Sequence, residues 1–151
     1  MVTDIWGVKA NYPEFIDVAK AVVAAFNKHG DQLKLSAYTA GSLPIKVHEL
    51  WEQPVRGGMS SNTLESCRHM VCYIMAHKVQ AYDHFGMRWR FLSNAAIAAH
   101  LNRSPSTIRK SIVRGCHQRH QGPYPVIYKT AIAKLKAQGF DLFSNGVERC
   151  Q

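Results

Sequence analysis

The sequence predicts an all-α protein built as a helical bundle, and three observations support this. Apolar residues recur at the three- and four-residue spacing of amphipathic helices in several segments. Residues that favour helix starts and helix ends flank these segments. Hydrophobic residues make up 46% and charged residues only 19% of the 151 residues, which excludes a disordered chain and allows a core of ordinary size. We expect one domain over residues 13–140, with an N-terminal arm at residues 1–12 and a C-terminal tail at residues 141–151.

The first predicted helix spans residues 14–28. Pro13 suits its start, because the missing N–H group of proline costs nothing in the first turn. Asp17 in the first turn and Lys28 in the last are favourable for the helix dipole, and Gly30 then ends the helix. One buried face is formed by Phe15, Ile16, Val18, Ala19, Val22, Val23 and Phe26.

Residues 31–58 allow two interpretations. The segments 33–38 and 45–48 alternate between apolar and polar residues, with a turn-forming stretch between them, which is compatible with a short β-hairpin near residues 33–48. An irregular loop with a helical turn near Val47–Trp51 fits equally well.

The rest of the chain is predicted to be mainly helical. A long helix is expected over residues 64–80, followed by a turn at 83–90. Two short helices at 94–101 and 104–116 come next, and a last helix runs over 126–138.

Positive charge is concentrated in one part of the sequence. The formal net charge is +9, and no acidic residue occurs between residues 84 and 140. A polyanion is the simplest partner, because contacts of Lys and Arg with phosphate supply most non-specific affinity for nucleic acids. A solvated basic surface without a partner is the alternative. The cations of this stretch are Arg88, Arg90, Arg103, Arg109, Lys110, Arg114, Arg119, Lys129, Lys134 and Lys136.

Residues 91–114 fit a helix-turn-helix. Ser93 and Ser104 are good N-cap residues for its two helices, and Pro105 suits the first position of the second helix. A turn of about 3–4 residues joins the helices. In this motif the second helix enters the major groove of DNA with its N-terminal residues against the base edges. The apolar anchors of the two helices are Ile97, Leu101, Ile108 and Ile112.

The order of residue types in this stretch also carries a family resemblance. An isoleucine and a small residue are followed by an apolar, a small polar and a basic residue, and then by hydroxyl residues before an apolar position. This pattern resembles the C-terminal DNA-binding domain of the bacterial replication initiator DnaA, well over residues 60–138 and loosely over 14–59. The resemblance implies an all-helical fold of the Trp-repressor type. The matching residues are Ile97, Ala98, Leu101, Asn102, Arg103, Ser106, Thr107, Ile108, Ser111 and Arg114.

Two features depart from that family. Ser104 and Pro105 replace an Asp-His pair that helps to read the family's duplex site, and Arg109 takes a position that is usually apolar. The resemblance therefore implies DNA binding of the same kind at a different site. The sequence has no Gly-rich loop before a Lys and a Ser or Thr, so the ATPase module of an initiator is missing. We expect a stand-alone regulator of transcription or replication, encoded by a phage or a mobile element.

The predicted interface with double-stranded DNA uses two sets of side chains. Helix-turn-helix proteins often bind paired half-sites as dimers, which leaves a homodimer open. The predicted base contacts are Ser104, Ser106, Thr107 and Lys110. The predicted phosphate contacts are Arg68, Arg88, Arg90, Arg103, Arg109 and Arg114.

Metal binding and catalysis have little support in the sequence. Cys67 and Cys72 lack the close spacing of usual zinc ligands and would lie on different sides of a helix. We therefore expect buried cysteines, with no metal and no other cofactor. Clustered carboxylates and a nucleophile-base signature are missing, so we expect no enzyme.

A protein-interaction module is the alternative function. The helical domain could dock on a host factor as an inhibitor, with Tyr38 and Trp51 in an exposed patch, although packing of both rings on the core is simpler. No apolar run approaches the length of a membrane span, and residues 1–6 lack the build of a secretory signal. We expect no membrane partner and a cytoplasmic, nucleoid-associated protein.

Overall fold

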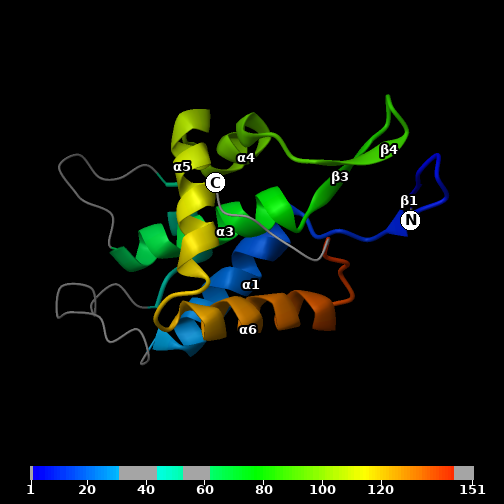
Figure 1. Cartoon of the computed structure of the whole chain (residues 1–151). Helices are drawn as coiled ribbons and strands as arrows, with labels where there is room; N and C mark the ends of the chain where they lie inside the picture. The colour runs from blue at the N-terminus through cyan, green and yellow to red at the C-terminus, as the bar shows by residue number, and fades with distance from the viewer. Residues whose placement is uncertain (1, 31–43, 53–61, 145–151) are drawn as a thin grey trace.

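A computed structural model describes residues 2–30, 44–52 and 62–144 (Figure 1). Over these residues the fold is mainly helical with two short antiparallel hairpins, which confirms the predicted all-α class. The strands are β1 (Val2–Thr3), β2 (Lys9–Ala10), β3 (Gln80–Asp83) and β4 (Arg88–Phe91). The helices are α1 (Phe15–Lys28), the 3₁₀ helix η2 (Val47–Leu50), α3 (Asn62–His77), α4 (Asn94–Leu101), α5 (Pro105–Gln118) and α6 (Tyr124–Ala137).

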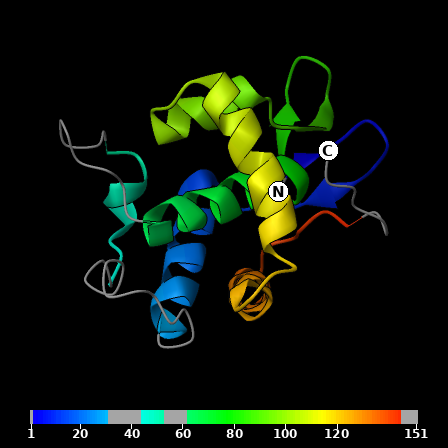
Figure 2. The same ribbon diagram turned by 60° about the vertical axis from the view of Figure 1, so that its left-hand side comes forward.

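Helix α3 lies at the centre of the bundle. It packs against both α5 and α1, and α6 lies along α1, away from α4 (Figures 1 and 2). A helix that packs on several sides must be apolar around its circumference, which explains the composition of α3. Its fully buried residues include Cys67, Met70, Val71, Cys72, Tyr73, Ile74 and Met75. In the part of the chain that the structure describes, no helix combines the length and apolar character that crossing a bilayer requires.

Helix α1 is held at both ends by side-chain hydrogen bonds. At its start, the Asp17 carboxylate accepts a hydrogen bond from the Glu14 N–H group at 3.0 Å. Near its end, Asn27 Nδ2 donates to the carbonyl oxygen of Ile45 at 3.0 Å, and Asn27 Oδ1 accepts from the Ile45 N–H group at 2.8 Å. This pair of bonds fixes the segment before η2 against α1.

Two β-hairpins form where the sequence predicts an irregular arm at residues 1–12 and a turn at residues 83–90. β1 pairs with β2 inside residues 1–12. β3 pairs with β4 with Gln80 opposite Phe91, so the predicted turn at 83–90 shrinks to residues 84–87 and the rest of it is strand. Met87 closes the second hairpin with a φ of 55°. Its carbonyl oxygen accepts a hydrogen bond from the Ile5 N–H group at 2.9 Å, which joins the two hairpins into one projecting unit (Figure 1).

The segment with two interpretations is described only in part. Residues 31–43, which include Tyr38 and most of the predicted hairpin near 33–48, lie outside the described residues. Where that hairpin would end, the Glu49 carboxylate accepts a hydrogen bond from the Lys46 N–H group at 2.8 Å and caps η2, so a helical turn forms instead of a strand. Trp51 is half-buried with its ring 6.0 Å from that of Phe15, so it packs on the core.

Candidate nucleic-acid interface

Two serines set the starts of α4 and α5, which are joined by a short turn. Ser93 Oγ accepts a hydrogen bond from the Ala96 N–H group at 3.1 Å, and Ser104 Oγ accepts one from the Thr107 N–H group at 3.2 Å. Asn102 ends α4 in the left-handed conformation with φ 55° and ψ 45°, which its short polar side chain tolerates. The structure thus has both helices where the sequence predicts them.

The inner faces of this helix pair pack into the core. Ile97, Leu101 and Ile108 each expose 1% or less of their surface. At the far end of α5, Gln118 Nε2 donates a hydrogen bond to the carbonyl oxygen of Ser66 in α3 at 3.1 Å. With this side of α5 held against α3, its opposite side faces solvent.

The outer face of α5 carries hydroxyl groups and positive charges. Ser106, Arg109, Lys110, Val113 and Arg114 recur at three- and four-residue spacing and line a shallow depression of about 430 Å³. All of them except Val113 are exposed. This face, defined by these five residues, offers hydrogen-bond donors and cations of the kind that contact base edges and phosphates.

The three hydroxyl residues predicted to contact bases are linked to one another. Ser104 Oγ lies 3.1 Å from Ser106 Oγ and 2.8 Å from Thr107 Oγ1. Because the Ser104 hydroxyl also caps the N-terminus of α5, its main role is structural. Ser106 and Thr107 are exposed at the N-terminus of α5, where backbone N–H groups and the helix dipole attract anions.

Arg114 stands at the border between the outer face of α5 and helix α3. Burial lowers the pKa of the His69 imidazole, the Glu65 carboxylate partly offsets this, and the charges of Arg114 and Arg68 lower the pKa further. His69 Nε2 lies 4.0 Å from Glu65 Oε2. The charge of Arg114 therefore acts on α3 as well as on the solvent side.

The structure contradicts the predicted phosphate contact of Arg68. This residue is only 4% exposed. Its Nε donates to the carbonyl oxygen of Leu50 at 2.9 Å, its Nη2 donates to that of Glu49 at 3.0 Å, and its Nη1 pairs with the Glu65 carboxylate. Arg68 anchors η2 on α3, and its guanidinium is turned inward rather than toward a ligand.

Arg103 also has a structural task. Its Nη1 donates to the carbonyl oxygens of Leu101 and Asn102 at 3.2 and 3.1 Å, and its Nη2 donates to that of Glu52 at 2.9 Å. The half-buried side chain links the α4–α5 turn to the residues after η2. A phosphate would have to compete with these bonds, so we do not include Arg103 in the proposed interface.

Arg88 and Arg90 lie on β4, which is separated from α5 by α4 (Figure 1). Both are exposed, and Arg90 Nε pairs with Asp83 Oδ2 at 3.1 Å. Trp89 between them is half-buried, with its Nε1 group donating to the carbonyl oxygen of Val8 at 3.3 Å. The structure therefore places these two cations on the hairpin and not beside the outer face of α5.

The cysteines of α3 are core residues. Cys67 and Cys72 are free thiols with no exposed surface. Burial raises the pKa of both thiols, that of Cys72 to about 12, while the charge of Arg68 opposes the shift. In the described ranges, no group of three or more His, Cys, Asp or Glu side chains is arranged to hold a metal ion.

The sequence does not predict the contact that Arg119, one of the cations between residues 84 and 140, makes with an aromatic ring of α3. The guanidinium carbon of Arg119 lies 4.9 Å from the centre of the Tyr73 ring, and the Tyr128 ring lies 5.9 Å from that of Tyr73. These contacts join the C-terminal end of α5 to α3 and α6. Arg119 therefore serves packing inside the fold.

Comparison of the chain with protein-family models, with curated proteins and with solved structures gave no match.

Proposed function

We propose that α4 and α5 form a DNA-binding helix-turn-helix and that α5 is its recognition helix. The observation that carries this proposal is the composition of the outer face of α5, where an exposed hydroxyl group is followed by Arg109, Lys110 and Arg114 without any acidic residue. In this motif the N-terminal residues of the second helix meet base edges, and flanking cations position the protein on the phosphates.

The proposed contacts differ along the interface. Ser106, Thr107 and Lys110 face the bases, because they are exposed in the first two turns of α5. Arg109 and Arg114 hold phosphates on either side of these residues. Arg88 and Arg90 lie on the hairpin beyond α4, at the same end of the molecule as α4 (Figure 1). They contact the phosphates of the duplex at a distance from the bases that α5 contacts.

The resemblance of residues 97–114 to the DnaA motif gives the proposal a second support. It favours a regulator of transcription or replication, encoded by a phage or mobile element and associated with the nucleoid. The departures at Ser104, Pro105 and Arg109 favour a target site unlike that of an initiator.

The test is selection from a random pool of DNA duplexes at two salt concentrations, followed by sequencing of the retained DNA. We expect an enriched motif and steep salt dependence, with each phosphate contact contributing about −0.9 to the slope of log affinity against log salt. Retention without an enriched motif would contradict the base contacts. No retention at physiological salt would overturn the proposal as a whole.

A protein-binding function is the second candidate, and a specific surface favours it. The two joined hairpins expose large apolar side chains, with Trp6 77% exposed and Phe85 fully exposed. Apolar patches of this kind often mark protein interaction sites. A Trp6→Ser, Phe85→Ser double variant that loses a protein captured from cell extract, with DNA retention intact, would support this second role. The exposed apolar residues of the hairpins are Ile5, Trp6, Val8, Phe85, Met87 and Phe91.

A further inference from the structure

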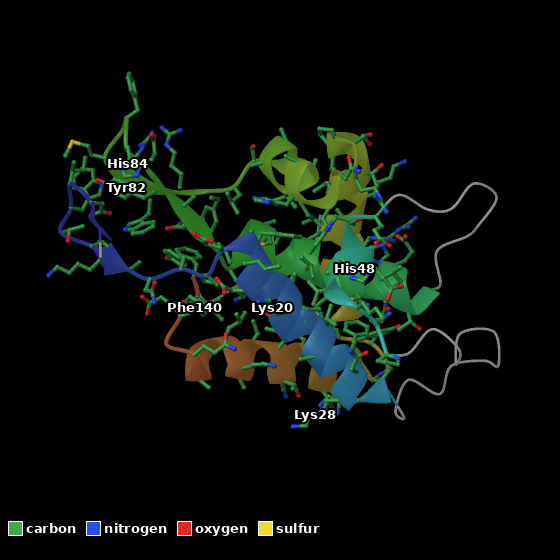
Figure 3. The ribbon with its side chains drawn as sticks, turned by 180° about the vertical axis from the view of Figure 1, so that it is seen from behind. Lys20, Lys28, His48, Tyr82, His84 and Phe140 are labelled. Carbon is green, nitrogen blue, oxygen red and sulfur yellow. The ribbon has the colours of Figure 1, made fainter. Side chains whose placement is uncertain are left out.

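A pocket of about 700 Å³ opens between the β3–β4 hairpin, the start of α1 and helix α4. This volume lies in the range of small-molecule sites. Figure 3 shows its surroundings from behind, with the N-terminal segment passing between the hairpin that carries Tyr82 and the turn that carries Phe140. The pocket belongs neither to the outer face of α5 nor to the apolar ends of the hairpins.

Aromatic rings form much of the wall of this pocket and hold one another in place. The Trp89 ring lies 5.3 Å from the rings of Tyr12 and Tyr82, in both cases edge to face. The Phe15 ring stacks on the imidazole of His100, with 4.8 Å between centroids and 9° between planes. A cage ordered before binding reduces the entropy that a ligand loses on entering it.

Unlike the outer face of α5, the described lining of the pocket contains no Lys or Arg. Among the described residues that line it, Glu14 is the only Asp, Glu, Lys or Arg. Asp141 lies close by, because its Oδ2 accepts a hydrogen bond from the Asn11 N–H group at 2.7 Å. Burial and the charge of Asp141 raise the pKa of the Tyr12 hydroxyl. Aromatic faces and carboxylates together attract cations and disfavour phosphates.

Three polar side chains in the lining are available to a ligand. The Tyr12 hydroxyl, the Gln80 amide and the His100 imidazole make no hydrogen bond to another side chain or to the backbone within the described ranges. A few polar groups in a mostly apolar wall fix the orientation of a small molecule. The pocket therefore has the composition of a binding site as well as the size of one.

We propose that this pocket binds a flat heteroaromatic cation of one or two rings. The rings of Tyr12, Tyr82 and Trp89 supply the stacking and cation–π surface, and Glu14 balances the positive charge. Gln80 and His100 bond to polar substituents at the edge of the ligand. This inference does not depend on DNA binding, so either proposal can fail without the other.

Three probes of similar size separate the features that the pocket should recognise. Protonated aminoquinoline is flat and cationic, naphthoate is flat and anionic, and protonated decahydroquinoline is cationic but not flat. Titrations of the full chain followed by ligand-observed NMR should show saturable binding of aminoquinoline, about tenfold tighter than that of either other probe. Absence of saturable binding, or equal binding of the three probes, would overturn the proposal.

Two variants locate the binding. Gln80 lines the pocket and lies on the face of the hairpin that carries Tyr82 and Trp89, so Gln80→Trp should fill the pocket and weaken aminoquinoline binding about tenfold or more. Ala133→Trp, at an exposed site on α6, is the control and should bind as wild type does. If Gln80→Trp does not fold, Glu14→Gln should still reduce the preference for the cation over naphthoate. Binding that ignores both Gln80→Trp and Glu14→Gln would place the probe elsewhere and contradict the inference.

Discussion

Gly115 in α5 crosses α3 so closely that a Cβ atom at this position would lie 2.2 Å from the carbonyl oxygen of His69. The same Cβ would lie 2.9 Å from Cβ of Tyr73. Both atoms belong to the least movable part of α3. The crossing determines how deeply α5 sits in the bundle, and therefore which of its side chains face solvent.

Gly115→Ala should lower the free energy of unfolding by about 3 kcal/mol, because the backbone of α3 cannot move aside as a flexible side chain could. The higher helix propensity of alanine offsets only about 1 kcal/mol of the strain. Denaturant unfolding followed by circular dichroism measures the change. The neighbouring exposed substitution Arg114→Ala is the control and should stay within about 0.5 kcal/mol of wild type. A Gly115→Ala protein as stable as wild type would contradict the close crossing.

Lys110→Ala and Arg114→Ala should affect DNA binding differently. Lys110 is proposed to contact bases, so its loss should cost about 1–3 kcal/mol on the selected site and little on random DNA. Arg114 is proposed to contact phosphate, so its loss should weaken binding to all duplexes and reduce the salt slope by about 1. Fluorescence anisotropy on the selected and a scrambled duplex at several salt concentrations measures both effects.

The matched control for these variants is Lys134→Ala on α6. It removes the same charge from an exposed position on the helix that lies away from α4 (Figure 1). We expect wild-type affinity and salt slope. If Lys134→Ala weakens binding as much as Arg114→Ala does, affinity follows the net charge of the protein and the assignment of α5 is wrong.

The helices could be predicted because their signals are local. Ser93 and Ser104 cap α4 and α5 through hydrogen bonds to residues three positions further on, so both starts can be read from short stretches. The buried positions Ile97, Leu101 and Ile108 follow from the helical repeat. The β3–β4 hairpin was missed because its strands are only four residues long and its turn uses Met87, a non-glycine residue with positive φ.

The sequence could not predict the structural roles of Arg68 and Arg103, nor the existence of the pocket. Both depend on contacts between segments that are distant in sequence. Arg68 looks like any basic residue near the start of a helix, and only the carbonyl groups of η2 show why it is buried. Arg103 is diverted in the same way by the carbonyl group of Glu52. The pocket needs rings from the N-terminal segment, the hairpin and α4, and no sequence motif joins Tyr12, Trp89 and His100.

Arg68→Ala should reduce stability without changing the salt dependence of DNA binding. The variant leaves the carbonyl oxygens of Leu50 and Glu49 without this donor, and the loss of charge-assisted hydrogen bonds in a buried site costs about 3 kcal/mol. Thermal unfolding measures the first effect, and the salt slope at a temperature where the variant is folded measures the second. A slope reduced as far as in Arg114→Ala would restore Arg68 to the phosphate contacts.

Arg114→Ala should raise the pKa of His69. The positive charge of Arg114 disfavours the imidazolium form, so its removal makes protonation easier, while burial and Arg68 still hold the pKa below its usual value. Titration of the His69 ring protons by NMR measures the shift. Lys134→Ala should leave this titration unchanged, and an unchanged His69 pKa in Arg114→Ala would place the guanidinium away from α3.

Cys72 should make the protein less stable in alkaline solution. Burial raises the pKa of this thiol from 9.0 to about 12, so above pH 9 the unfolded chain releases a proton that the folded protein keeps. Stability is therefore fully present below pH 9 and falls by about 1.4 kcal/mol per pH unit as pH rises through this window. Denaturant unfolding of wild type and Cys72→Ala between about pH 8 and about pH 11 isolates the effect of the Cys72 thiol on stability. The variant is less stable than wild type at neutral pH, but it lacks the decrease in stability that ionisation of this thiol causes at alkaline pH. Parallel pH profiles for the two proteins would show that the thiol is as easily ionised in the folded state as in the unfolded chain, contrary to its buried position in α3.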